Sequence, residues 1–155
     1  MRARAIPAAI VLALVAGLWI FLAGRALAEN YGGLSRTQAA RVEHAIAAWF
    51  RTDAAAMRCI AWRESGLNAR AYNDDDWPTQ SVAGVFQIAW PVWTPANPNV
   101  TAQPRRYGWV LRFWHHRAPT WLEFRQRLAN PVQSIRLAWL LYRHEGGLRH
   151  WGGAC

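Results

Sequence analysis

Glu64 is the residue of this sequence whose position most favours acid–base chemistry. At helical intervals it continues an apolar stripe that consists of Met57, Ile60 and Ala61. This spacing predicts that the Glu64 carboxyl faces inward near the end of a helix. A carboxyl against an apolar core is costly to ionise, so we expect it to keep a proton near neutral pH and to suit general acid catalysis. The alternative is a boundary carboxylate paired with Arg63 or Arg70, and spacing alone leaves both interpretations open.

The elements that must position Glu64 are predicted mostly as helices. Ser35 and Gln38 form a capping box, and Asn130-Pro131 is an N-cap followed by a proline in the first helical turn. The predicted helices run from Ser35 to about residue 50, from Thr52 or Asp53 to about Glu64 with Gly66 as the stop, within residues 104–116, from Thr120 to near Asn130, and from Pro131 to the Gly146-Gly147 pair. In the irregular region between them, Val82 to Ala89 is the segment that favours a strand or hairpin.

The composition places the chain among folded single domains. Its 155 residues are 53% hydrophobic and 17% charged, which excludes a disordered or collagen-like chain. All 18 basic residues are arginine, and with 9 acidic residues the formal net charge is +9. The 11 tryptophans are amphipathic rings that pack in cores and also line clefts for flat, ring-shaped ligands.

The first thirty residues have the features of an export signal. Two arginines precede an apolar run from Ala8 to Ala23, and Ala26-Leu27-Ala28 matches a small-x-small cleavage site. We predict a signal peptide over residues 1–28 and a mature domain over residues 29–155. The alternative is an uncleaved membrane anchor, because the segment from Ile6 to Ala23 is just long enough to span a bilayer. Either form places the domain outside the cytoplasmic membrane, secreted or in the cell envelope.

Export makes a disulfide the expected state of Cys59 and Cys155, the two cysteines of the chain. It would close a loop of about 100 residues and contribute roughly 4–5 kcal/mol in the chain-entropy model. The alternatives are two free thiols or a disulfide with a partner protein. Metal-binding motifs are absent from the sequence, so neither a metal site nor a cofactor is predicted.

Several motifs resemble one known family. Glu64-Ser65-Gly66-Leu67-Asn68, followed by Ser-Val-Ala-Gly-Val-Phe-Gln-Ile at residues 81–88, resembles the lysozyme-like fold of soluble lytic transglycosylases and goose-type lysozymes. Residues 130–142 and the closing residues 151–155 resemble later motifs of that family. The resemblance implies a mainly α, single lysozyme-like domain with a small irregular or β-hairpin segment. It covers about residues 35–155.

Two departures limit the resemblance near the C-terminus. Ser134 stands where the family commonly has asparagine, and Tyr142-Arg143-His144-Glu145-Gly146 replaces the usual Ala-Tyr-Asn motif. Substrate contacts from the last third of the chain are therefore the least defined part of the resemblance.

The resemblance implies that the domain cleaves the MurNAc-GlcNAc bond of peptidoglycan as a lytic transglycosylase, with Glu64 as general acid and base. The substrate-binding residues implied with it are Ser65, Gly84, Phe86, Gln87, Ile88, Trp90, Trp93 and Tyr142. For each tryptophan, packing in the core or in a loop is the alternative. The implied partners are peptidoglycan glycan strands, with the chain acting as a monomer and the membrane involved only if the signal is uncleaved. The positive charge suits an anionic wall polymer.

Other functions remain open from the sequence. Glycoside hydrolysis needs a second carboxyl, and Asp74, Asp75 or Asp76 would supply one if they do not form a solvated loop. A non-catalytic wall-binding protein on the same scaffold is a further alternative. Arginines interleaved with aromatic residues also suit nucleic-acid binding, but the predicted export argues against that function.

Overall fold

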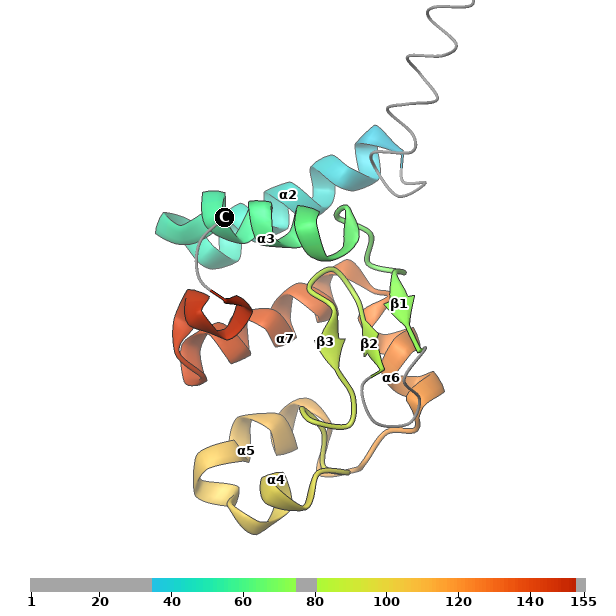
Figure 1. Cartoon of the computed structure of the whole chain (residues 1–155), viewed down its shortest axis with the longest axis vertical. Coiled ribbons are helices and arrows are strands. Elements are labelled where there is room, and N and C mark those ends of the chain that lie inside the picture. Colours follow the sequence, from blue (N-terminus) through green and yellow to red (C-terminus); the bar gives the residue numbers. More distant parts are fainter. Residues whose placement is uncertain (1–34, 75–80, 153–155) are drawn as a thin grey trace, which may run out of the picture.

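The computed structural model describes residues 35–74 and 81–152 and shows a mainly helical chain (Figure 1). The elements, in chain order, are α2 (Arg36–Phe50), the 3-10 helix η1 (Arg51–Asp53), α3 (Ala54–Ser65), β1 (Tyr72–Asn73), β2 (Val82–Ala83), β3 (Ile88–Ala89), α4 (Pro98–Ala102), α5 (Pro104–Phe113), α6 (Trp121–Leu128), α7 (Pro131–His144) and the 3-10 helix η2 (Gly147–Trp151). Within these two ranges, no helix has the length and apolar character needed to cross a membrane. The predicted export signal lies outside the described residues.

The helices lie in two groups at opposite ends of the molecule, with the small sheet between them (Figure 1). Helices α2 and α3 lie together at one end, α4 and α5 lie at the other, and α7 passes behind the strands (Figure 1). Helix α2 contacts both α3 and α7, and η2 returns to contact α3. The inner faces of these helices are apolar and almost fully buried, with α2 contributing Ala39, Val42, Ile46 and Phe50. Burial of this shared core is what holds the end of α3 in place.

Three of the helix ends that the sequence predicted are confirmed. Ser35 and Gln38 form the expected capping box at the start of α2. Asn130 accepts hydrogen bonds from the first turn of α7, where Pro131 is the first helical residue. Gly66 ends α3 with φ of 60°, in the left-handed region that a glycine adopts without strain. These ends are local features of sequence, which is why they were predictable.

The sheet is a three-stranded antiparallel meander of two-residue strands. In it, β2 pairs with β3 so that Val82 lies opposite Ala89, which confirms the predicted hairpin. The sequence analysis missed β1, in which Tyr72 lies opposite Ala83. Both residues of β1 are exposed, so this strand has no hydrophobic alternation for a sequence to reveal. Helix α4 and the two 3-10 helices were missed as well.

Gly84 follows β2 at the tightest approach between the sheet and the helices behind it. Its φ is 85°, and a Cβ built there would lie 2.5 Å from Ser134 Oγ and 3.1 Å from Leu128 Cβ. The position therefore requires glycine both for its backbone conformation and for the space beside α6 and α7.

Replacing Gly84 by alanine should lower the free energy of unfolding by about 3 kcal/mol, because the strain of a positive φ adds to the clash with Ser134. The control is Gly146→Ala, since Gly146 also has a positive φ but no atom within 4 Å of a built Cβ. It should cost only about 1 kcal/mol. Urea denaturation of both variants measures the difference, and equal losses would contradict the close approach.

The predicted disulfide joins Cys59, which the structure describes, to Cys155, which lies outside the described residues. Cys59 is exposed on α3, and the described residues contain no free cysteine. Cys155 lies outside the described residues, so its pairing with Cys59 stays a prediction. Peptide mapping of exported protein without reductant should recover Cys59 joined to Cys155. Recovery of both cysteines as alkylated thiols would refute the bridge.

Candidate functional site around Glu64

Glu64 lies in the last turn of α3, which ends at Ser65. The apolar stripe that precedes it is buried as predicted, since Met57, Ile60 and Ala61 are all 0% exposed. Beyond it the chain turns sharply at Gly66 and Leu67, both with positive φ. The Glu64 side chain itself is 27% exposed. It lies at the edge of the core and not inside it, so the sealed apolar setting expected from the sequence is not what the structure has.

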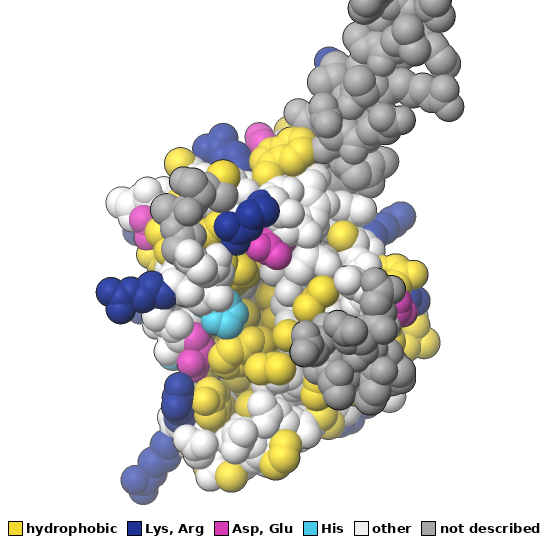
Figure 2. Space-filling view, viewed as in Figure 1, with side chains coloured by type: hydrophobic (Ala, Val, Ile, Leu, Met, Phe, Trp, Pro, Cys, Tyr) yellow, Lys and Arg dark blue, Asp and Glu magenta, His cyan; other side chains and the backbone are white. Residues whose placement is uncertain are grey.

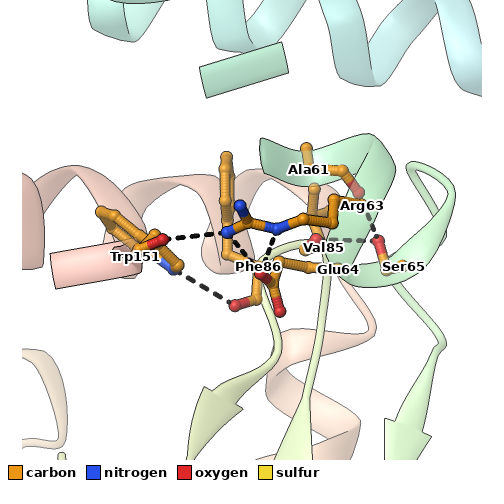
Figure 3. Close-up of polar contacts among 7 residues, drawn as sticks. All are labelled: Ala61, Arg63, Glu64, Ser65, Val85, Phe86 and Trp151. Carbon is orange, nitrogen blue, oxygen red and sulfur yellow. Dashed lines mark hydrogen bonds and ion pairs between the residues drawn. The ribbon is translucent and has the colours of Figure 1, made fainter. Parts of the chain in front are cut away.

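The Glu64 carboxylate is bound by its neighbour Arg63. Arg63 donates to Glu64 Oε1 through Nε at 3.1 Å and through a terminal nitrogen at 3.0 Å. The same terminal nitrogen donates to the backbone carbonyl of Trp151 at 2.9 Å (Figure 3). The sequence left Arg63 and Arg70 as possible ion-pair partners of Glu64, and in the structure the partner is Arg63. Oε2 has no hydrogen-bond partner among the described residues and is the oxygen available to a ligand.

Ser65 connects the end of α3 to the turn between β2 and β3. Its hydroxyl donates to the carbonyl of Val85 at 2.7 Å (Figure 3). The amide of Val85 donates in turn to Ser134 Oγ on α7 at 2.9 Å. Both backbone polar groups of this fully buried residue are therefore satisfied by serine hydroxyls from two different helices. The contact of Ser65 places the Glu64 region beside residues 84–88.

Apart from Gln87, the turn is almost entirely buried. Gln87 has a φ of 45°, and its Nε2 donates to the carbonyls of Gly84 at 2.9 Å and Ala71 at 3.2 Å. Its Oε1 has no partner among the described residues. Phe86 and Ile88 are 1% and 3% exposed, so these two residues belong to the core and offer little surface to a ligand.

A row of four rings leads away from Glu64. Phe86 packs against Trp151 with ring centres 5.6 Å apart, Trp151 against His150 at 4.7 Å, and His150 against Trp93 at 5.3 Å. Trp151 also donates its indole nitrogen to the Phe86 carbonyl at 3.4 Å. Burial lowers the pKa of His150, and the nearby Glu145 carboxylate opposes that effect. The last three rings are half-buried.

Figure 2 shows the face on which these elements lie. Hydrophobic side chains gather in a band down its middle, beside a histidine and below an adjacent basic and acidic pair. Glu64 and residues 84–88 line none of three pockets of 390, 590 and 200 Å³ found elsewhere on the surface. The site thus lies apart from these three pockets, on a face bordered by rings.

The structure brings Trp93 into this row and places the other two predicted stacking residues elsewhere. Trp90 donates to the Pro119 carbonyl at 3.2 Å and packs against Trp121 at 6.3 Å, as a loop-packing residue does. Tyr142 donates its hydroxyl to the Asp53 carboxylate, which raises the pKa of the phenol, and its ring meets Phe50 at 5.5 Å. None of these contacts involves Glu64.

A second carboxylate opposite Glu64 is not found among the described residues. Asp74 is exposed after β1, and Asp75 and Asp76 lie outside the described residues. Glu145 is largely buried and pairs with Arg106 at 3.3 Å. In the part of the chain that the structure describes, no three histidine, cysteine or acidic side chains converge as metal ligands would.

Sequence reasoning missed three parts of this site. Ser134 was noted only as a departure from the family pattern, although its hydroxyl holds the Val85 amide. His150 and the ring of Trp151 were not assigned a role because η2 reaches the site from far along the chain. The available signal for Ser134 was that a serine stands where the family commonly has asparagine.

Comparisons with known proteins add no relative. No protein-family model, curated protein or solved structure matches the chain. The family resemblance therefore rests on the short motifs and carries expectations only.

Replacing Ser134 by alanine should lower the free energy of unfolding by about 2 kcal/mol, because it leaves the buried Val85 amide without an acceptor. The matched control is Thr101→Ala, which removes an exposed hydroxyl bound to the Pro98 carbonyl at 3.0 Å. It should change the stability by no more than about 0.5 kcal/mol. Chemical denaturation compares the two, and a Ser134→Ala loss as small as the control would show that water serves the amide equally well.

Proposed function

We propose that this protein is an exported peptidoglycan-cleaving enzyme, a lytic transglycosylase that acts on the MurNAc-GlcNAc bond with Glu64 as general acid and base. The observation that carries the proposal is the geometry of the Glu64 carboxylate. Arg63 holds Oε1, while Oε2 is left for a ligand at a partly exposed helix end beside the Gly84–Ile88 turn. The half-buried rings that continue from this point offer flat apolar surface to sugar rings.

The proposed reaction needs one carboxyl in two roles. In the first step Glu64 gives its proton to the bridging oxygen, the bond from that oxygen to the MurNAc C1 breaks, and the substrate's acetamido group stabilises the cationic sugar. In the second step the carboxylate takes a proton from the primary hydroxyl of the same sugar, whose oxygen bonds to C1 and closes an anhydro ring. Arg63 is placed to stabilise the carboxylate that exists between the two steps.

The remaining parts of the proposal concern the location and the wall polymer. The sequence pattern of residues 1–28 supports export, cleaved or as an anchor, and thus a place outside the cytoplasmic membrane. The positive net charge, which residues 29–155 retain without Arg2, Arg4 and Arg25, supports contact with a wall polymer that carries carboxylates or phosphates. We propose that the domain acts as a monomer on glycan strands.

Two other functions use the same residues. A muramidase that hydrolyses the bond would need a second carboxylate, which an acid from Asp74 to Asp76 would have to supply. A non-catalytic wall-binding protein is favoured by one observation, the ion pair of Glu64 with Arg63, because such a pair can also be purely structural. The products of digestion separate all three.

Purified peptidoglycan incubated with the mature domain should release anhydro-muropeptides, measured by mass. Glu64→Gln should reduce that release by at least about 100-fold, because it removes the group that transfers the proton. The matched control is Glu43→Gln on α2, outside the site, which should keep full activity.

Each alternative has its own result in this digestion. Products with reducing ends would replace the transglycosylase by the hydrolase. Binding to peptidoglycan without any release would leave the non-catalytic protein, and equal release by wild type and Glu64→Gln would exclude Glu64 as the acid.

A further inference from the structure

A pocket of about 590 Å³ lies between the C-terminal ends of α2 and α7. Its size falls within the range of pockets that bind small molecules. None of the residues around Glu64 lines it. The residues that shape it are Trp49, Arg51, Thr52, Trp139, Tyr142 and Arg143.

The wall of this pocket is aromatic and fixed in place. Trp49 and Trp139 are half-buried and meet edge to face with ring centres 5.3 Å apart. Tyr142 is held by the bond from its hydroxyl to Asp53 and by the ring of Phe50. Rings that are already immobilised lose little entropy when a flat ligand packs on them.

The rim of the pocket carries unpaired positive charge. Arg51 and Arg143 are both exposed, and neither forms an ion pair with any residue in the described ranges. The Arg143 guanidinium lies 5.3 Å from the centre of the Trp139 ring. The Asp53 carboxylate accepts a hydrogen bond from the Tyr142 hydroxyl. A guanidinium in such a place is suited to a carboxylate or phosphate.

The backbone of Arg51 is strained. Its φ is 46° and its ψ is −105°, a conformation that is costly for any residue with a Cβ. The amide of Arg51 closes α2 on the Ala47 carbonyl, a contact that glycine would make equally well. The contact therefore does not depend on the side chain, which lies on the rim of the pocket with its guanidinium.

We propose that this pocket binds a sugar ring that carries an anionic group, with the ring on the Trp49 and Trp139 surface and the anion between Arg51 and Arg143. A carboxylate or a phosphate on the sugar would satisfy the same two guanidinium groups. The pocket shares no residue with the Glu64 site, so binding here does not require the proposed cleavage. Under the proposed function, the pocket would in addition hold one segment of an acidic glycan while another segment is at Glu64.

The first experiment follows the indole N–H signals of Trp49 and Trp139 by NMR during titration of the folded domain. The probes are N-acetylmuramic acid, glucose 6-phosphate, neutral N-acetylglucosamine and inorganic phosphate. At least one of the two anionic sugars should bind about tenfold more tightly than both of the last two probes. Equal affinity for N-acetylglucosamine, or for phosphate alone, would overturn the proposal, and the two anionic sugars show which anion is preferred.

The second experiment measures both sugar affinity and Tm in each variant, so that a loss of binding can be distinguished from a loss of folding. Arg51→Gly should weaken binding of the preferred sugar about tenfold and raise Tm by about 3 °C, because it removes both the guanidinium and the strain. Arg143→Ala should weaken binding to a similar degree. The control Arg36→Ala removes an exposed arginine of α2 outside the pocket and should change neither quantity.

Two results decide the outcome. Wild-type affinity in both Arg51→Gly and Arg143→Ala would overturn the assignment of the rim. Glu64→Gln should bind the sugar normally even if it is inactive on peptidoglycan, so that failure of the cleavage proposal and failure of this one are distinct observations.

Discussion

The backbone of Val85 is the constraint on which the rest of the site depends. This residue is fully buried, and its carbonyl and its amide N–H are bound by Ser65 of α3 and Ser134 of α7. Leaving either of these buried backbone groups unpaired would cost about 1–3 kcal/mol. Because the two serines belong to different helices, this single residue fixes the end of α3, the sheet turn and the start of α7 relative to one another.

The placement of charge at Glu64 follows from the same arrangement. The turn that Ser65 anchors brings the Phe86 carbonyl to the indole of Trp151, and Trp151 offers its own carbonyl to Arg63. Arg63 thereby lies across one oxygen of the carboxylate and leaves the other free. Under the proposed mechanism this gives the carboxylate a fixed orientation and a counter-charge in its ionised form, without a second acid opposite it.

Short-range sequence signals predicted most of the α-helices, but they could not predict contacts between distant segments. The capping box at Ser35, the stop at Gly66 and the inward stripe of α3 are each defined by residues a few positions apart. The exposure of Glu64 and its capture by Arg63 depend on where η2 packs, which periodicity cannot show. The strand β1 has no alternation, and the role of Ser134 needs the position of Val85, 49 residues away in the chain.

The bond from Arg63 to Trp151 joins residues 88 positions apart. Closing a loop of this length has an entropic cost that the surrounding contacts must offset. A polypeptide that ends before Trp151 has the acidic side chain but lacks the carbonyl that aligns its guanidinium neighbour. Under the proposed function, alignment of the reactive centre is thereby tied to synthesis and folding of the chain as far as Trp151.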